Sequence, residues 1–235
     1  MPIALGRIEA VLLGKAAPYT RPDTYSGIDK SVVAGPVQVR RLGLCGDEQG
    51  DLRVHGGVDK AIHQYPAEHY SSWTAELGHL PLLEKPGAFG ENIHGRGMTE
   101  ADICLGDRLR VGSLVVEVSQ GRLPCWKLND RFSVADMALR IQQTQRCGWY
   151  YRVLEEGCIA AGDLFHLLDR PHPAWSIQRI AAAFHAQEVD VPLLQELLEL
   201  PLVPSWRKIF QRRLDTLCVE DWSARLQGPP RDGGN

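Results

Sequence analysis

The chain has 235 residues, of which 44% are hydrophobic and 23% are charged, and its formal net charge is −3 at pH 7. This balance excludes a wholly disordered chain, and it argues against a protein that binds nucleic acid through a basic surface. Such a length predicts one large domain, or one domain with a small appendage, that folds without disulfides or a structural metal. No apolar run reaches the roughly 20 residues of a membrane-spanning helix, and no secretory signal is visible, so we expect a cytoplasmic protein that binds no membrane.

Short runs of β-branched and aromatic residues recur through the first 170 residues and predict strands. They are Arg7–Leu13, Val37–Leu42, Ala61–Tyr65, Leu109–Val111, Leu114–Ser119, Trp149–Leu154 and Leu164–Leu168. Gly112-Ser113 separates two of these runs and predicts a two-residue hairpin turn. Two helices are expected among the strands. Ala67–Leu77 follows a proline and ends before Gly78, and Ser133–Arg146 starts with a Ser-x-x-Asp pattern typical of helix N-termini.

Three or four short amphipathic helices are predicted from Ser176 onward, because the apolar residues there repeat with a helical period. Of the 23 glycines, all but three lie at or before Gly162, which fits a body of strands and loops followed by a helical end. We therefore predict a mainly β, barrel-like body over residues 1–170, a small C-terminal α-helical domain over 171–228 and a disordered tail over 229–235. A basic cluster on one of these helices is expected to form a solvated face: Arg207, Lys208, Arg212 and Arg213.

Two loop segments combine glycines with polar side chains, a composition that lets a backbone approach a ligand closely. The first is Val54–Lys60, which contains His55-Gly56-Gly57 and Asp59-Lys60. His55, Asp59 and His63 have the spacing of a metal-binding helix face, but the two glycines and the strand that follows disfavour a zinc site. The second is Pro86–Asn92, where glycines flank Phe89, Glu91 and Asn92. Taken alone, each segment also fits a polar surface turn.

Cys125 stands out among the six cysteines because it follows a proline and lies between Arg122 and Lys127. Neighbouring cations favour the thiolate, which is the form that acts as a nucleophile or as a soft metal ligand. Taken alone, Cys125 is about equally consistent with a structural cysteine. The sequence has no GxSxG, HExxH, GxxxxGK[ST] or GxGxxG motif, which excludes the common hydrolase, metalloprotease and nucleotide-binding signatures.

Five segments of the chain together resemble the MOSC family, named after the C-terminal domain of molybdenum-cofactor sulfurase. They are Gly43-Leu44-x-Gly46-Asp47-Glu48-Gln49, His55-Gly56-Gly57-x-Asp59-Lys60-Ala61, Phe89-Gly90-Glu91-Asn92, Gly106-Asp107-x-Leu109 and Ser119-Gln120-x-Arg122-x-Pro124-Cys125-x-Lys127-Leu128. The helical end, with Ser205-Trp206 and Gln211-Arg212-Arg213-Leu214, looks like the three-helix extension of the YiiM-type members. The resemblance covers nearly the whole chain, to about Leu226.

The resemblance implies a β-barrel-like body that binds the molybdenum cofactor in a molybdopterin form, with Cys125 as the catalytic residue and thiolate ligand of molybdenum. It further implies a reductase of N-hydroxylated compounds such as 6-N-hydroxylaminopurine, which detoxifies them with electrons from a donor protein. The cofactor-binding residues that it implies are His55, Gly56, Gly57, Asp59, Lys60, Phe89, Gly90, Glu91, Asn92, Arg122 and Lys127. Among these, the lysines and the arginine are candidates for holding the pterin phosphate.

Two other functions stay open at the level of sequence. The chain would also fit a non-catalytic carrier of molybdenum cofactor or sulfur, or a metal-free transferase that uses the Cys125 thiol. The helical end either caps the barrel or docks an electron donor through its Arg207–Arg213 face. In one position the chain departs from the family, because Gly121 replaces the usual proline before Arg122, and glycine loosens that loop.

Overall fold

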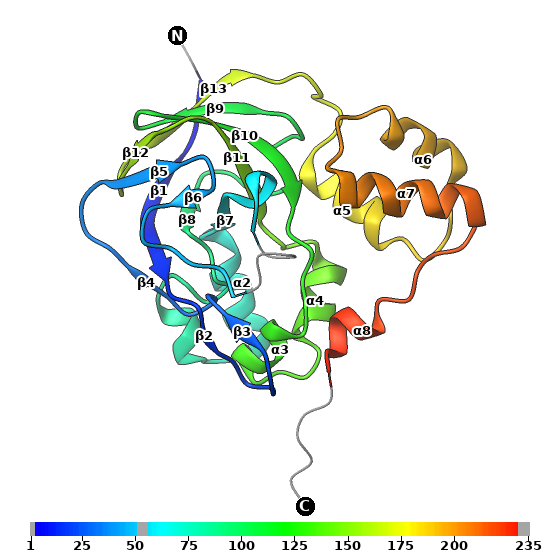
Figure 1. The fold of residues 1–235 in the computed structure, drawn as a ribbon, viewed down its shortest axis with the longest axis horizontal. Helices are drawn as coiled ribbons and strands as arrows, with labels where there is room; N and C mark the ends of the chain where they lie inside the picture. Colours follow the sequence, from blue (N-terminus) through cyan, green and yellow to red (C-terminus); the bar gives the residue numbers. More distant parts are fainter. Residues whose placement is uncertain (1–2, 51–55, 230–235) are drawn as a thin grey trace, which may run out of the picture.

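The computed structural model describes residues 3–50 and 56–229, and its central element is a closed barrel of seven strands (Figure 1). The strand order is β13-β9-β10-β11-β7-β8-β1, and the pairing of β13 with β1 closes the barrel. Only β7 and β8 run parallel among these neighbours. The barrel strands are β1 (Ile3–Gly14), β7 (Ile62–Pro66), β8 (Ile93–Arg96), β9 (Arg108–Val111), β10 (Leu114–Gly121), β11 (Trp149–Glu155) and β13 (Leu164–Asp169).

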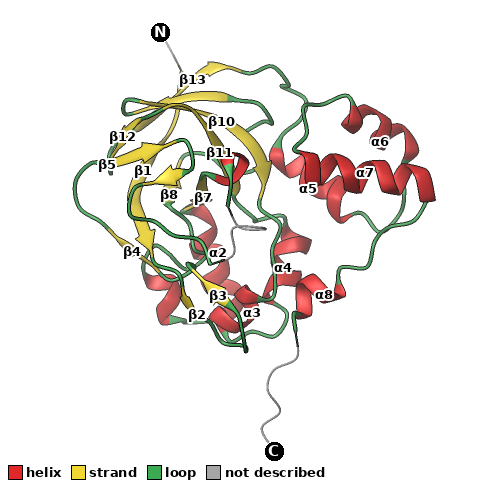
Figure 2. Cartoon of the chain, viewed as in Figure 1, coloured by secondary structure: helices red, strands yellow, loops and turns green. Residues whose placement is uncertain are grey.

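Shorter elements surround the barrel (Figure 2). The remaining strands are β2 (Ala17–Pro18), β3 (Tyr25–Ser26), β4 (Lys30–Val32), β5 (Val37–Arg40), β6 (Gly43–Leu44) and β12 (Gly157–Ile159). The helices of this part are the short 3-10 helices η1 (Val58–Lys60) and η2 (Pro81–Glu84), together with α2 (Glu68–Leu77), α3 (Lys127–Phe132) and α4 (Met137–Thr144). None of the helices in the described ranges is long and apolar enough to cross a bilayer.

Some barrel strands alternate between solvent and the apolar interior, whereas β7 and most of β10 are buried along their length. In β9, Arg108 and Arg110 are exposed, whereas Leu109 and Val111 are buried. Every strand that the sequence predicts is present, with bounds shifted by a few residues, and the predicted hairpin is confirmed by the pairing of Leu114 with Val111. The predicted mainly β, barrel-like body is therefore confirmed.

The prediction of one helix over Ser133–Arg146 is wrong at its start. Ser133 ends α3 in a left-handed conformation (φ 54°), and α4 begins only at Met137. The side chain of Asn129 accepts a hydrogen bond from the Ala138 N–H at 2.7 Å, which fixes the turn between the two helices. Leu128 and Phe132 are buried, so tertiary packing stabilises a short helix that local sequence did not predict.

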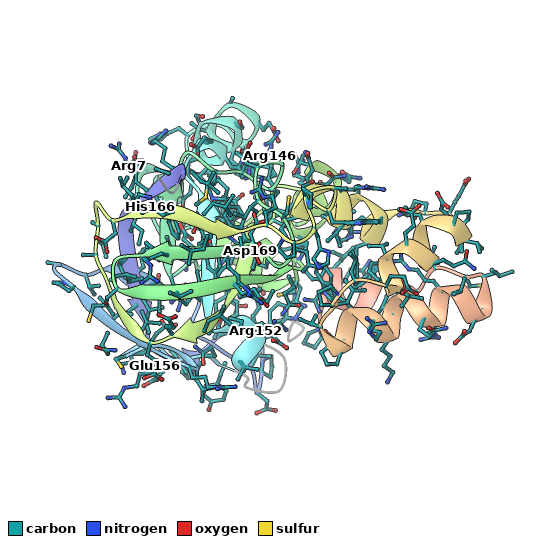
Figure 3. The ribbon with its side chains drawn as sticks, turned by 90° about the horizontal axis from the view of Figure 1, so that it is seen from above. Arg7, Arg146, Arg152, Glu156, His166 and Asp169 are labelled. Carbon is teal, nitrogen blue, oxygen red and sulfur yellow. The ribbon has the colours of Figure 1, made fainter. Side chains whose placement is uncertain are left out.

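The C-terminal helices form a group that we call the helical region: α5 (Ile177–His185), α6 (Val191–Leu198), α7 (Pro204–Thr216) and α8 (Ser223–Gln227). Seen from above, α5 to α7 extend to one side of the barrel (Figure 3). The Ser176 side chain caps α5 by accepting from the Arg179 N–H at 3.2 Å, as expected from a helix that begins there. Ile177 packs into the barrel core, and Leu105 of the barrel packs into the core of the helical region. The helical region therefore covers one side of the barrel.

The expectation of a solvated basic face is wrong for Arg213, which is 2% exposed. Its guanidinium pairs with Glu220 at 2.7 Å and donates to the backbone carbonyls of Ala183 and Phe184 at 2.9 and 2.6 Å. Helix α7 turns this side chain inward, where it joins the end of α5 to the segment before α8.

Replacing Arg213 by alanine is expected to destabilise the fold by about 3 kcal/mol, because it leaves Glu220 and two carbonyl groups without their donor. The measurement is urea unfolding followed by circular dichroism. Arg212→Ala is the matched control, since Arg212 is exposed on the same helix, and a change within about 0.5 kcal/mol is expected there. Equal effects of the two substitutions would contradict the role of Arg213 as a buried side chain that joins α5 to the segment before α8.

Candidate functional site

The segment that carries Cys125 connects the end of β10 to α3 and is held from both sides. The Arg122 N–H donates to the Gly148 carbonyl at 3.0 Å, and the Cys125 carbonyl accepts from the Leu128 N–H at 3.0 Å. On the other side, the Arg225 carbonyl of α8 accepts from the Trp126 N–H at 2.9 Å. The Cys125 side chain is half-buried and forms no disulfide. Its loop is thus fixed by hydrogen bonds and not by a disulfide.

The C-terminal end of the chain reinforces the same loop. The Arg225 guanidinium donates to the carbonyls of Pro124 and Leu123, both at 2.9 Å. The Asn129 side-chain amide donates to the Leu226 carbonyl at 2.8 Å. Figure 1 shows α8 returning from the helical region to lie beside α3. Helix α8 therefore holds the cysteine loop in place through these hydrogen bonds.

Gly121 permits the close contact between this loop and the helical region. A Cβ atom at this position would lie 3.1 Å from Ile177, which is tighter than ordinary packing, and 3.5 Å from Trp206, which is an ordinary contact. A larger side chain at this position would need the space that Ile177 occupies. The glycine is therefore explained by the approach of the helical region.

A cavity with an empty volume of about 590 Å³ opens beside Cys125. It brings together seven of the predicted site residues from distant parts of the sequence: Lys60, Phe89, Gly90, Asn92, Arg122, Cys125 and Lys127. Gly90 has a left-handed backbone (φ 71°), and a Cβ atom there would lie 2.6 Å from Ile28, so only glycine fits this part of the wall. These residues are far apart in the chain, and only the barrel makes them neighbours.

Four predicted residues within the described chain do not line this cavity. Gly56 and Gly57 lie in the turn before η1, and Gly57 has open space around it. Asp59 turns its carboxylate toward Arg152, which is labelled in Figure 3, at 2.6 Å. Glu91 is fully buried behind the cavity wall. His55 lies outside the described residues.

Glu91 organises the loop that presents Phe89 and Gly90. Its carboxylate accepts from the N–H groups of Gly87 and Phe89 at 2.9 and 3.1 Å, and from the hydroxyl of Tyr70. Burial acts to raise the pKa of Glu91, but the His94 ring and these donors outweigh it and lower the pKa to about 2. The buried carboxylate is therefore an ionised positioning group.

The lining of the cavity beside Cys125 has more cationic side chains than carboxylates, since the carboxylates are those of Asp47 and Glu48. Lys60, Arg122 and Lys127 line it, and Arg225 of α8 lies close enough to interact with Cys125 and Lys60. Burial, reinforced by repulsion from Arg225, lowers the pKa of Lys60. One terminal nitrogen of Arg122 is buried without a hydrogen-bond partner among the described residues. Such a group indicates an anionic ligand, since buried guanidinium groups are normally satisfied.

A second wall of the cavity is built on Asp47. Its carboxylate accepts from the Gly14 N–H at 2.8 Å and the Asn92 amide at 2.9 Å, and it also contacts the Lys30 ammonium. Burial lowers the pKa of Lys30, although Asp47 opposes this shift. The hydrogen bond from the Asn92 amide to Asp47 fixes Asn92 at the edge of the cavity.

His63 lies in the same cavity, whereas His55, the first residue of the disfavoured zinc arrangement, lies outside the described residues. Among the described residues, no three histidine, cysteine or acidic side chains lie close enough to hold a metal ion together. Burial lowers the pKa of His63 to about 3, so its ring is neutral at physiological pH. Its Nε2 atom is buried without a hydrogen-bond partner among the described residues.

Several cavity residues were not among the predicted site residues: Lys30, Asp47, His63 and Tyr150 line it, and Arg225 lies at its edge. Asp47 belongs to a motif that carried the family resemblance, and His63 was considered only as a metal ligand. Tyr150 reads as an ordinary strand residue, and Arg225 lies 101 positions after Pro124, whose carbonyl it contacts. No local pattern in the sequence marks Tyr150 or Arg225 as a residue of the site.

Comparison with known proteins gives consistent matches along the chain. The family model of the MOSC domain matches residues 51–166, and the family model of the YiiM-like, 3-alpha helix domain matches residues 175–217. The Protein YiiM of Escherichia coli is 37% identical over 214 residues, which are 91% of this chain and 94% of that protein. The crystal structure of YiiM from Geobacillus stearothermophilus has a TM-score of 0.76 and 36% identity, covering 89% of this chain and 99% of that one.

A longer relative is the protein named "Reductase" from Gibberella moniliformis. It is 37% identical over 213 residues, which are 90% of this chain but only 36% of the relative. The chain thus spans about a third of that protein's length.

Proposed function

Because this chain belongs to the MOSC family and carries its YiiM-like 3-alpha helix domain, we propose that it is a molybdenum-cofactor-dependent reductase of N-hydroxylated compounds. The observation that carries the proposal is a half-buried, unpaired cysteine at the wall of a cavity lined by more cationic side chains than carboxylates. A protein named as a reductase is similar to nine-tenths of the chain, which supports an oxidoreductase role.

The residues of the cavity fit the chemistry of such a cofactor. The Cys125 sulfur is a soft donor of the kind suited to molybdenum. Lys60, Arg122 and Lys127 would hold the anionic phosphate of the pterin, and the unpartnered Arg122 nitrogen would gain an acceptor.

The proposed reaction converts R–NHOH to R–NH2 and water with two electrons and two protons. The N–O bond breaks, the nitrogen is reduced, and the electrons come from a redox partner protein. When bound, the cofactor supplies this two-electron chemistry.

The protein's own groups bind and orient the reactants around that chemistry. Burial raises the pKa of Tyr150, so its hydroxyl stays protonated at neutral pH and can donate a hydrogen bond into the cavity. The neutral ring of His63 offers a second hydrogen-bonding group there.

The test is metal and pterin analysis of protein expressed in a host that makes molybdopterin, combined with a reduction assay on 6-N-hydroxylaminopurine. One molybdenum per chain and donor-dependent formation of adenine are expected. Bound cofactor without reduction by any of several electron donors would identify a carrier instead. Absence of both metal and pterin, with a reactive Cys125, would identify a thiol transferase.

Replacing Arg122 by glutamine is expected to reduce cofactor affinity about tenfold, because a charged hydrogen-bond donor to the phosphate is lost. The measurement is the molybdenum and pterin content after dialysis. Arg152→Gln is the matched control, since Arg152 pairs with Asp59 and Glu117 and does not line the cavity. Similar losses in both variants would show that Arg122 acts only through the fold.

A further inference from the structure

Arg131 does not line the cavity beside Cys125, yet it joins two of the segments that form the cavity. It belongs to α3, which begins two residues after Cys125. Its guanidinium reaches the turn of residues 87–90, which we call the Phe89 loop. The Nε atom donates to the Ala88 carbonyl at 2.8 Å, and Nη2 donates to the Gly87 carbonyl at 2.9 Å. Arg131 therefore links the helix after the cysteine to the Phe89 loop.

The Phe89 loop depends on such side-chain partners because its backbone belongs to no helix or strand. The Glu91 carboxylate accepts from the N–H groups of Gly87 and Phe89 at 2.9 and 3.1 Å. The Arg131 guanidinium donates to carbonyl groups of the same loop. One carboxylate thus satisfies N–H groups of the loop and one guanidinium satisfies its carbonyls. Backbone groups that lack a regular ladder are placed by the side chains that bond to them.

The carbonyl contacts of Arg131 matter more than its ion pair with Asp29. That pair is 3.2 Å long, and the Asp29 side chain is 92% exposed, so the pair contributes little. The Arg131 side chain is only 11% exposed, and hydrogen bonds from a charged donor in such a place are strong. A guanidinium also donates to two carbonyls at once through its planar fork, which a lysine ammonium does not reproduce.

An apolar contact accompanies the hydrogen bonds between α3 and the Phe89 loop. The ring of Phe132, next to Arg131, packs against Phe89 with the ring centroids 5.0 Å apart. Cys125 lines the cavity from the segment before α3, and Phe89 and Gly90 line it from the loop. The distance between these two walls is therefore set by the contact of α3 with the Phe89 loop.

We propose that Arg131 is a positioning residue, which fixes the Phe89 loop against α3 and so keeps the cavity beside Cys125 closed around its ligand. Without the two carbonyl contacts, the loop opens more often, Cys125 becomes more accessible, and a bound group leaves faster. The inference rests on the proposed function where it concerns the cofactor. The access to Cys125 is a property of the protein without any ligand.

The first test measures how fast iodoacetamide alkylates Cys125 in full-length Arg131→Gln from a host that makes no molybdopterin, with the modified cysteines located by peptide mass spectrometry. The rate at Cys125 is expected to rise about tenfold above that of the wild type, because two charged hydrogen bonds that hold the loop are lost. Exposed Cys45 and buried Cys104 are internal references, and their rates should not change. A rise at Cys104 equal to that at Cys125 would show general unfolding and overturn the positioning role.

Three further variants separate the carbonyl contacts from charge and from fold stability. Arg131→Lys keeps the charge but not the fork, so an intermediate rate is expected. Asp29→Asn removes only the exposed ion pair and should change the rate less than about twofold. Arg140→Gln is the matched control, because Arg140 pairs with Asp136 on the next helix and does not line the cavity. An unchanged rate in both Arg131 variants, or an equal acceleration in Asp29→Asn, would overturn the proposal.

The second test uses the same variants from a host that makes molybdopterin and follows the loss of molybdenum during dialysis. Arg131→Gln is expected to lose the metal about tenfold faster than the wild type, and Arg140→Gln at the wild-type rate. Faster alkylation of Cys125 with unchanged retention of molybdenum would overturn the positioning role. Faster alkylation in a protein whose wild type binds neither molybdenum nor pterin would instead overturn the proposed function alone.

Discussion

Replacing Cys125 by serine is expected to lower both the molybdenum content and the rate of N-hydroxylamine reduction by at least about 100-fold. A serine hydroxyl is a harder donor than a thiolate and is rarely ionised near neutral pH, so it is a poor ligand for a soft metal centre. The side chain is half-buried in a loop held by backbone hydrogen bonds, and the substitution removes no disulfide. The fold should therefore persist, with a melting temperature close to that of the wild type.

Cys45→Ser provides the control for this experiment, because Cys45 is an exposed free cysteine that does not line the cavity beside Cys125. It should retain the full molybdenum content and activity. Undiminished molybdenum in Cys125→Ser would exclude this cysteine as the metal ligand, whatever happens to the activity.

Replacing Glu91 by glutamine is expected to destabilise the protein by about 3 kcal/mol at pH 7. The carboxylate is completely buried and accepts hydrogen bonds from the Gly87 and Phe89 N–H groups and from Tyr70. An amide NH2 group in its place would face these donors and leave at least one of them unsatisfied. Chemical denaturation gives the free energy of unfolding. Glu84→Gln, on an exposed side chain, should change it by less than about 0.5 kcal/mol.

The wild type and Glu91→Gln are also expected to differ in how their free energy of unfolding depends on pH. The pKa of Glu91 is lowered to about 2 in the folded protein, from 4.5. Its ionisation therefore stabilises the fold fully above about pH 4.5, and this contribution is lost as the pH falls toward 2. Because Glu91→Gln has no such group, the difference in stability between the two proteins should shrink between pH 5 and pH 3. A difference independent of pH over this range would refute the ionised, buried carboxylate.

The cysteine loop can be singled out from the sequence because its signals are local. Cys125, Arg122 and Lys127 lie within six positions of one another, and Gly87 and Gly90 lie within two positions of Phe89. Glu91 shows the limit of such a prediction. It belongs to the right segment, but the structure buries its carboxylate under the loop, where it accepts from backbone N–H groups and does not line the cavity.

Residues whose position depends on long-range packing could not be found in this way. Tyr150 reads as one residue of an ordinary strand, and it reaches the cavity because β11 pairs with β7 beside His63. Arg225 reaches the cysteine loop because α8 folds back across the molecule and donates to Pro124 and Leu123. Helix α3 forms where its buried apolar side chains are covered, although Ser133 suggested a later helix start.

The sequence by itself determined the strand-rich body and the helical end and made Cys125 a candidate, since alternation, helical period and neighbouring cations are properties of adjacent residues. Only the tertiary structure decided how these parts meet. Closing the barrel joins Lys60, Asn92 and Cys125 in one cavity, and the absence of a side chain at Gly121 lets Ile177 of the helical region pack closely against the end of β10. Such contacts depend on the shapes of surfaces that are distant in the chain, and no local pattern in the sequence specifies them.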